Sequence, residues 1–156
     1  MVTVGKPSSA TPSGDALAGW RRWAWYWGPA LAWAMLLYAV SAQSALPRPG
    51  QRLGLSDDLV NYTTHALSYG LLAWLVWRPL HAGVGRLPDV AGTFSGLAAW
   101  LFAVMYALFD EVHQAFVPGR TASGWDVLAD ALGAAVTLAI IGWWHGREGD
   151  ISAGRG

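Results

Sequence analysis

Cysteine is absent from the 156 residues of this chain. That absence excludes a disulfide framework, a thiolate zinc site and a cysteine nucleophile together. Charge is also scarce, since Asp, Glu, Lys and Arg make up 13% of the residues, against about 25% in a typical soluble domain. The 10 basic and 10 acidic side chains cancel. No basic excess is therefore present to hold nucleic acid by counterion release, and we expect no nucleic-acid partner.

Apolar and aromatic residues take the place of charge, with 54% hydrophobic residues and 11 tryptophans. Four runs almost free of charge lie at about 24–43, 64–80, 91–109 and 127–144. A run of about 20 such residues crosses the hydrocarbon core of a bilayer. The sequence thus predicts an all-α polytopic membrane protein, a bundle of four transmembrane helices in a lipid bilayer. A cleaved signal peptide is the alternative for the first run, although that run is long and aromatic for one.

The polar segments around these runs predict the domain organisation and the orientation. We expect a disordered cytoplasmic tail at 1–19, a membrane domain at 20–145 and a polar C-terminal tail at 146–156. Four spans put both termini and the loop after the second span on one side, and the loops at about 44–63 and 110–126 on the other. Lys and Arg favour the first side by seven to three, so both termini should be cytoplasmic. The seven are Lys6, Arg21, Arg22, Arg78, Arg86, Arg147 and Arg155, and the three are Arg48, Arg52 and Arg120.

Small residues four apart indicate where the helices approach one another. Gly92 with Gly96, and Ala129 with Gly133, form such pairs in the third and fourth runs. Close backbone approach at small residues carries much of the packing between helices in lipid. We therefore predict helix contacts at both pairs.

Polar residues gather where the runs meet the outward side. Asn61, His65 and Tyr69 recur every fourth residue, so they line one stripe if the second helix has begun by Asn61. Asp110, which ends the third run, is likewise followed at i+3 and i+4 by His113 and Gln114. A lone interfacial His with an aromatic-belt Tyr is the plainer interpretation of the first stripe.

The segment that follows predicts a turn and a new helix. Pro118-Gly119 is a stop signal, and Ser123 with Asp126 resembles a capping box at the start of the fourth helix. Asp130 then lies about one turn inside the membrane. An intramembrane carboxylate is costly, so Asp130 should face inward with a partner, for which Arg120, His113, His65 or a bound cation are the candidates. His81 and His145 are expected in solvated cytoplasmic loops.

The stretch DEVHQAFVPGRTASGWDVLADALGA resembles the signature of the VanZ-like family. That signature comprises an acidic pair, His-Gln, an aromatic residue, Pro-Gly-Arg, Ser, an Asp followed by a hydrophobic residue, and a Gly-containing segment, and an upstream His-x-x-x-Tyr matches His65 and Tyr69. The resemblance covers about residues 30–144. Many members have Asp-Lys where this chain has Asn61-Tyr62, and many have Asn at the position of Asp130. The matched positions are Asp110, Glu111, His113, Gln114, Phe116, Pro118, Gly119, Arg120, Ser123, Asp126 and Gly133.

The resemblance implies a protein of the bacterial cytoplasmic (inner) membrane, acting in the cell envelope and linked to resistance against teicoplanin-type glycopeptides. Three hypotheses stay open for its polar residues. They bind an anionic headgroup or a cell-wall precursor at the outer face through Arg120, they catalyse metal-assisted or acid–base chemistry on a lipid-linked substrate, or they form a purely structural network in which Arg120 pairs with Asp110 or Asp126. The surplus of carboxylates opposes anion binding unless a divalent cation reconciles them.

The sequence assigns no catalytic residue and requires no cofactor, although it leaves room for a divalent cation. The candidate polar site comprises His65, Tyr69, Asp110, Glu111, His113, Gln114, Arg120, Asp126 and Asp130, and the structural motif around it comprises Pro118, Gly119, Ser123 and Gly133.

Overall fold

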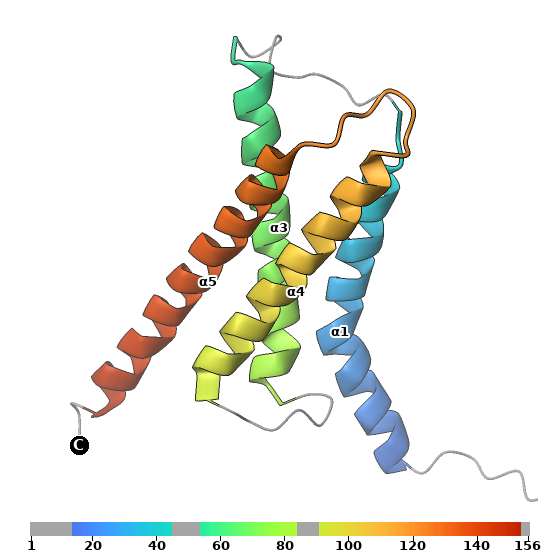
Figure 1. The fold of residues 1–156 in the computed structure, drawn as a ribbon. Coiled ribbons are helices and arrows are strands. Elements are labelled where there is room, and N and C mark those ends of the chain that lie inside the picture. The colour runs from blue at the N-terminus through green and yellow to red at the C-terminus, as the bar shows by residue number, and fades with distance from the viewer. Residues whose placement is uncertain (1–13, 45–53, 84–90, 154–156) are drawn as a thin grey trace, which may run out of the picture.

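The computed structural model describes residues 14–44, 54–83 and 91–153. Four helices account for most of these residues, and no strand occurs among them, so the all-α prediction is confirmed (Figure 1). The helices are α1 (Gly14–Ser41), α3 (Asp57–His81), α4 (Ala91–Gln114) and α5 (Gly124–Ala153). They alternate in direction, so the end of α1, the start of α3, the end of α4 and the start of α5 meet at what we call the upper end. The opposite end is the lower end.

The helices extend beyond the apolar runs that predict them. α1 begins at Gly14, inside the segment 1–19 that we expected to be disordered, and α5 continues to Ala153 through most of the expected tail at 146–156. Residues 1–13 and 154–156 lie outside the described part of the chain. His81 and His145 are helical, which corrects the prediction that they lie in loops. Hydropathy marks where a helix leaves an apolar environment, and a helix can continue past that point.

Two of the described helices contain segments long and apolar enough to cross a membrane, at Phe94–Gln114 in α4 and Gly124–His145 in α5. The four-span prediction is thus supported for α4 and α5 only. The other two helices are more polar at one end. α1 starts with an Arg-containing aromatic segment, and α3 carries Asp57, Asp58, Asn61 and His65 in its first turns.

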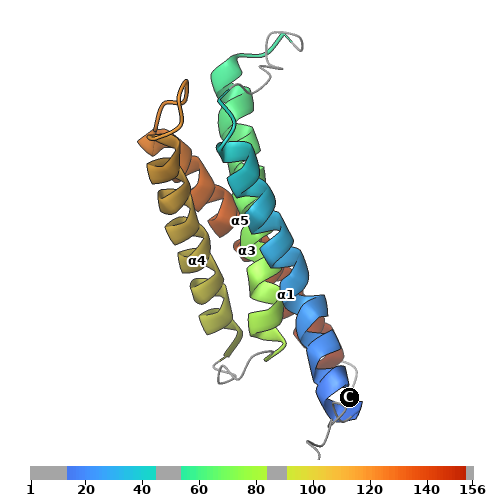
Figure 2. The same cartoon turned by 90° about the vertical axis from the view of Figure 1, so that its right-hand side faces the viewer.

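α3 is the central helix of the bundle. It packs most extensively against α5 and also contacts α4 and α1, whereas α1 meets α4 only slightly and does not meet α5 within the described residues (Figure 2). Its buried face includes Tyr69, Leu72 and Val76, which form the core with residues of α1 and α4. Toward the lower end α5 diverges from α4 (Figure 1). The closest backbone approach of α3 and α5 lies in the upper half, at Ala66 and Gly133, while His145 of α5 still contacts Trp77 and His81 of α3 lower down.

Small residues make this contact close at Gly133, one of the predicted positions, whereas the surroundings of Gly92 lie outside what the structure describes. A Cβ at Gly133 would collide with the backbone of Ala66, so α5 approaches α3 directly there. Gly96 has nothing within 4 Å of its Cβ position, which corrects the predicted contact in α4. α4 instead packs through Ala99, Ala103 and Ala107, which are buried and recur every fourth residue.

Candidate functional site

The upper ends of α3 and α5 are joined by a chain of polar contacts. His65 Nδ1 lies 3.0 Å from Asp130 Oδ1, and His65 Nε2 lies 3.8 Å from Asp126 Oδ2. Asn61 donates from Nδ2 to Asp126 Oδ1 at 2.9 Å. α3 is helical from Asp57, so Asn61 and His65 do lie one turn apart on one stripe, as predicted. Of the partners considered for Asp130, the structure selects His65.

The two sides of the His65 ring are not equivalent. Asp130 is 2% exposed, and its carboxylate can only accept when it is ionised, so in the neutral His65 ring the proton is assigned to Nδ1. Nε2 then carries the lone pair, and its 3.8 Å separation from Asp126 is beyond hydrogen-bond range. Asp130 therefore fixes the ring and its tautomer, while Nε2 keeps the capacity to accept a proton.

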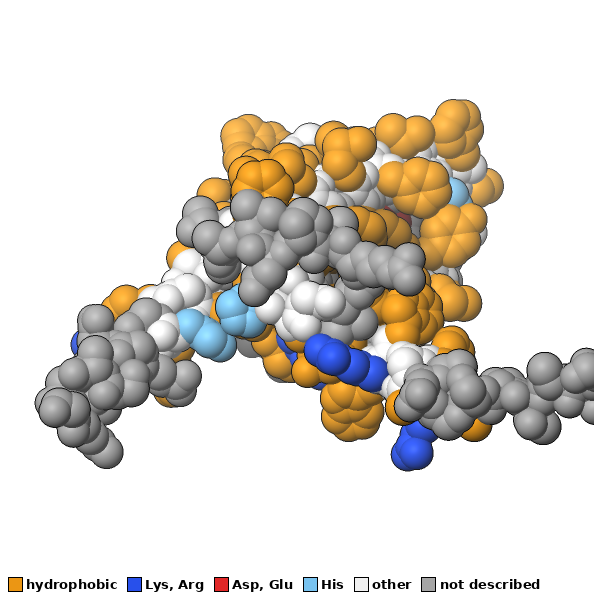
Figure 3. All heavy atoms as spheres, turned by 90° about the horizontal axis from the view of Figure 1, so that it is seen from below, with side chains coloured by type: hydrophobic (Ala, Val, Ile, Leu, Met, Phe, Trp, Pro, Cys, Tyr) orange, Lys and Arg blue, Asp and Glu red, His pale blue; other side chains and the backbone are white. Residues whose placement is uncertain are grey.

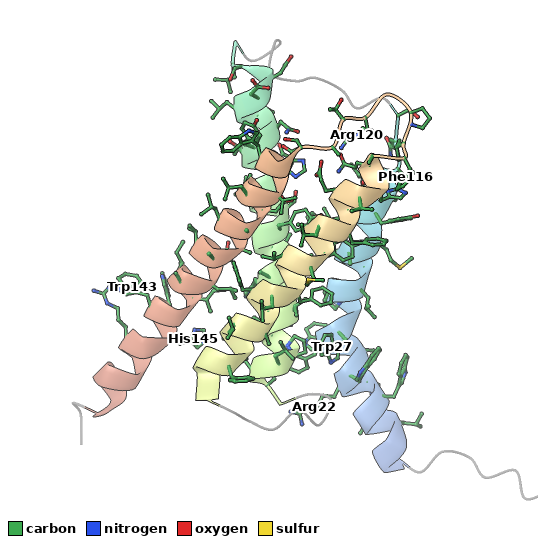
Figure 4. The ribbon with its side chains drawn as sticks, viewed as in Figure 1. Arg22, Trp27, Phe116, Arg120, Trp143 and His145 are labelled. Carbon is green, nitrogen blue, oxygen red and sulfur yellow. The ribbon has the colours of Figure 1, made fainter. Side chains whose placement is uncertain are left out.

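Gln114 links a second group of side chains, at the end of α4 and in the following loop. Its amide donates from Nε2 to Asp110 Oδ2 at 3.0 Å, and its Oε1 accepts from Arg120 Nε at 3.2 Å and Nη2 at 2.6 Å. Figure 4 shows Arg120 in the loop between α4 and α5 at the upper end. Gln114 is 2% exposed, so this link is buried at its centre. The α4 helix extends to Gln114, which places Asp110 and Gln114 one turn apart, as predicted.

The loop reaches α5 through a turn and a cap. Gly119 adopts φ +83°, where a side chain would be strained, and a Cβ there would lie 3.0 Å from Ser44 O. Pro118 precedes it in the exposed turn. The backbone N–H of Ser123 donates to the Glu111 carboxylate in a short hydrogen bond. Because α5 starts at Gly124, Glu111 places a negative charge at the N-terminus of that helix.

Four buried polar atoms of the upper half have no hydrogen-bond partner in the described part of the chain: Tyr69 Oη, Asp110 Oδ1, His113 Nδ1 and Ser41 Oγ. The side chains of Tyr69 and Asp110 are 2% and 5% exposed and interact with each other between α3 and α4, so the Tyr69 hydroxyl and Asp110 Oδ1 can pair with each other after a small adjustment. Buried polar atoms normally find partners in protein or ordered water. The region between α3 and α4 can therefore supply further hydrogen bonds.

His113 lies on the α1 side of α4. Its ring packs against Tyr38 of α1 at a centroid separation of 4.6 Å, with the two ring planes tilted by 36°. Sequence reasoning omitted Tyr38 and the buried Ser41 from the site, since neither belongs to a polar pattern. Both lie inside the first apolar run, and for Tyr38 the signal is its contact with Phe109 and His113 of α4.

These side chains can move a proton, accept donors and hold an anion at Arg120. No cluster of three or more His, Asp or Glu that could bind a metal occurs among the described residues. The Asp130 and Asp126 carboxylates lie beside different nitrogens of the His65 ring, so these three side chains do not surround a single position that a metal ion could occupy.

Comparison with known proteins identifies one related family. A family model described as VanZ/LLP1 matches residues 33–145, which include the last third of α1, all of α3 and α4, and most of α5. No curated protein and no solved structure matches the chain significantly.

Proposed function

The chain belongs to the VanZ/LLP1 family, and from this premise we propose that it is an envelope protein that binds an anionic group at its upper end. Proteins of this family are membrane proteins, and the family is linked to glycopeptide resistance. The ligand we propose is the phosphate or carboxylate of a lipid headgroup or a lipid-linked cell-wall precursor.

The observation that carries the proposal is the position of Arg120. Six acidic side chains are described at the upper end, yet none lies within 4.0 Å of a guanidinium nitrogen of Arg120 in the described part of the chain. Arg120 uses Nε and Nη2 on the neutral Gln114 oxygen, so Nη1 and the remaining N–H groups have no protein acceptor there. A guanidinium presents a planar fork that suits phosphate and carboxylate. Arg120 thus keeps donors for an anion.

The neighbouring carboxylates oppose an anion less than their number suggests. Asp126 and Asp130 interact with Asn61 and His65, Glu111 accepts from a backbone N–H, and Asp110 accepts from Gln114. Hydrogen bonds to a carboxylate stabilise and localise its charge. Gln114 also separates Asp110 from Arg120, which prevents the pairing that the structural hypothesis predicts.

The decisive test is Arg120→Lys in the full-length protein reconstituted in lipid nanodiscs. Lysine keeps the charge and loses the fork, so we expect about tenfold weaker binding of a lipid-linked pyrophosphate precursor. The corresponding uncharged polyprenol is the comparison ligand. Arg147→Lys, at the lower end, is the matched control and should bind as the parent protein does. Unchanged binding in Arg120→Lys, at normal membrane abundance and with normal glycopeptide susceptibility, would reject the proposal.

We also propose that all four helices span the membrane, with both termini cytoplasmic. α1 and α3 have 28 and 25 residues, more than the roughly 20 needed for a span. The described Arg side chains support the orientation, because Arg21, Arg22, Arg78 and Arg147 belong to the lower end and Arg120 to the upper. Reporter fusions at residue 85 and after residue 150 should both give a cytoplasmic signal, and a periplasmic signal at either position would overturn this topology.

Acid–base catalysis is the second candidate, because Asp130 orients His65 and leaves Nε2 free to accept a proton. A lipid-linked substrate would be converted by the parent protein and not by His65→Gln, while both bind it equally. If the parent protein binds the substrate and forms no product, catalysis is rejected and binding remains as the proposed function.

A further inference from the structure

The lower end presents a second set of polar side chains, separate from the candidate site. The six acidic side chains that the structure describes all belong to the upper end: Asp57, Asp58, Asp110, Glu111, Asp126 and Asp130. The lower end carries Arg21, Arg22, Arg78, Arg147, His81 and His145. Figure 3 shows two His side chains together there, beside Arg, and the ring centroids of His81 and His145 are 5.7 Å apart. This end is therefore cationic wherever its side chains are described.

Arg78 is half-buried, whereas the other described arginines of the lower end are exposed. Its guanidinium lies over the rings of Tyr26 and Trp74, at 5.7 and 5.4 Å from their centroids. The side chain is half-buried, and it has no hydrogen bond or carboxylate partner within the described residues. Aromatic rings cover a guanidinium face and leave the N–H groups at its edge. The N–H donors of Arg78 are therefore available to an acceptor. The ring contacts with Tyr26 of α1 and Trp74 of α3 limit the movement of its guanidinium.

Arg22 brings a second guanidinium to the same turn. Its Nη2 donates to Ala82 O at 3.2 Å, and the Ala82 N–H bonds back to Arg78 O at 3.1 Å, so Ala82 lies one turn after Arg78. The free carbonyls of a helix C-terminus carry partial negative charge, which would repel an anion. Arg22 offsets that charge. Arg22 of α1 and Arg78 of α3 therefore both supply positive charge at a helix end that would otherwise repel an anion.

We propose that Arg22 and Arg78 form a binding site for the phosphate of an anionic phospholipid, in the leaflet that meets the lower end. The charge favours a phosphate, and the surroundings favour a lipid over a soluble ion. Trp23 and Trp74 are 40% and 37% exposed beside these arginines, and indole rings of this kind lie at the headgroup level of a bilayer. The site acts independently of any ligand at the upper end.

The test uses the full-length protein in phosphatidylcholine nanodiscs that contain increasing fractions of phosphatidylglycerol. Native mass spectrometry counts bound phosphatidylglycerol, and the melting temperature reports stabilisation. We expect Arg78→Gln to weaken the apparent affinity about tenfold, because a charge-assisted contact to phosphate is lost. Arg78→Lys should lie between that variant and the parent protein.

Arg147→Gln is the matched control. It removes the same charge from the same end, and its guanidinium also lies over a ring, 4.0 Å from the Trp143 centroid. We expect it to change the affinity less than about twofold, as for a distant surface charge. Equal losses in Arg78→Gln and Arg147→Gln would show only general attraction to an anionic surface and would overturn the proposal.

Two further measurements complete the test. Soluble glycerol phosphate should neither compete with the lipid nor raise the melting temperature in pure phosphatidylcholine, and competition by it would overturn the assignment to a phospholipid. Melting in pure phosphatidylcholine checks folding. If Arg78→Gln melts lower there, Arg22→Gln replaces it, because the Arg22 side chain is exposed, and it must show the same loss of affinity for the proposal to stand.

Discussion

The charged side chains at the two ends of the bundle differ in sign and in the partners that they have. At the upper end, the carboxylates of α4 and α5 accept from side chains or backbone, in another segment for Asp130 with His65 and Glu111 with Ser123, and in the same helix for Asp110 with Gln114. At the lower end, Arg78 and Arg147 lie on aromatic faces without a carboxylate partner in the described part of the chain. Burial explains the difference. A buried charge needs a partner, whereas a long side chain at a boundary can extend into water.

The comparison also holds for packing within α5, whose backbone approaches α3 directly at Gly133 in the upper half and which contacts α3 through the His145 side chain in the lower half. We predict that Gly133→Val has the largest effect of any single change considered, because its side chain would occupy the backbone position of Ala66 and force α3 and α5 apart. The expected destabilisation is about 3 kcal/mol or more. Melting in detergent and abundance in the membrane measure it.

Gly142→Ala is the control in the same helix. No atom lies within 4 Å of the Cβ position at Gly142, so this substitution should be neutral or should stabilise by about 0.5–1 kcal/mol through helix propensity. Equal melting temperatures for the two variants would contradict the distinction between the halves of α5.

A double-mutant cycle tests the pairing at the upper end. His65→Leu leaves the Asp130 carboxylate buried without its partner, and we expect a loss of about 3 kcal/mol. His65→Leu with Asp130→Leu removes both polar groups, so the double variant should be more stable than the two single losses predict. Unfolding in detergent gives the three free energies. Additive losses would mean that the two side chains do not stabilise each other.

The sequence predicts this end of the molecule better than the packing. Periodicity places Asn61 with His65, and Asp110 with Gln114, on single stripes, because side chains four residues apart are neighbours on the surface of a helix. It cannot choose among partners across helices, so Asp130 had four candidates and Arg120 was expected to pair with a carboxylate in the structural hypothesis. That choice depends on which helices touch. The α3–α5 contact at Gly133 brings His65 to Asp130, and the turn at Gly119 leaves Arg120 beside Gln114.

Helix ends and small-residue contacts were harder to predict for a related reason. The composition around Gly14 and beyond His145 is polar and Gly-containing, which favours disorder when no neighbour is considered. Gly96 has the spacing of a contact residue and faces open space, while Ala103, in the same helix, is buried. Ala98 is only partly buried although it adjoins the buried Ala99, so small size and spacing alone do not identify the packed face of α4.

A small destabilisation is expected at the lower end, at Arg147. Its guanidinium lies 4.0 Å from the Trp143 ring centroid, and both side chains are exposed, so Arg147→Gln should cost about 0.5–1 kcal/mol. Arg21→Gln removes the same charge from an exposed side chain at the same end and should cost less, and the difference between the two melting free energies measures the ring contact. The loss at Arg147 must also remain well below that of His65→Leu, because exposed charges stay hydrated when a partner is lost and buried charges do not. If Arg147→Gln were as destabilising as His65→Leu, the lower end would depend on its charges as the upper end does, and the contrast between snorkelling cations and paired carboxylates would fail.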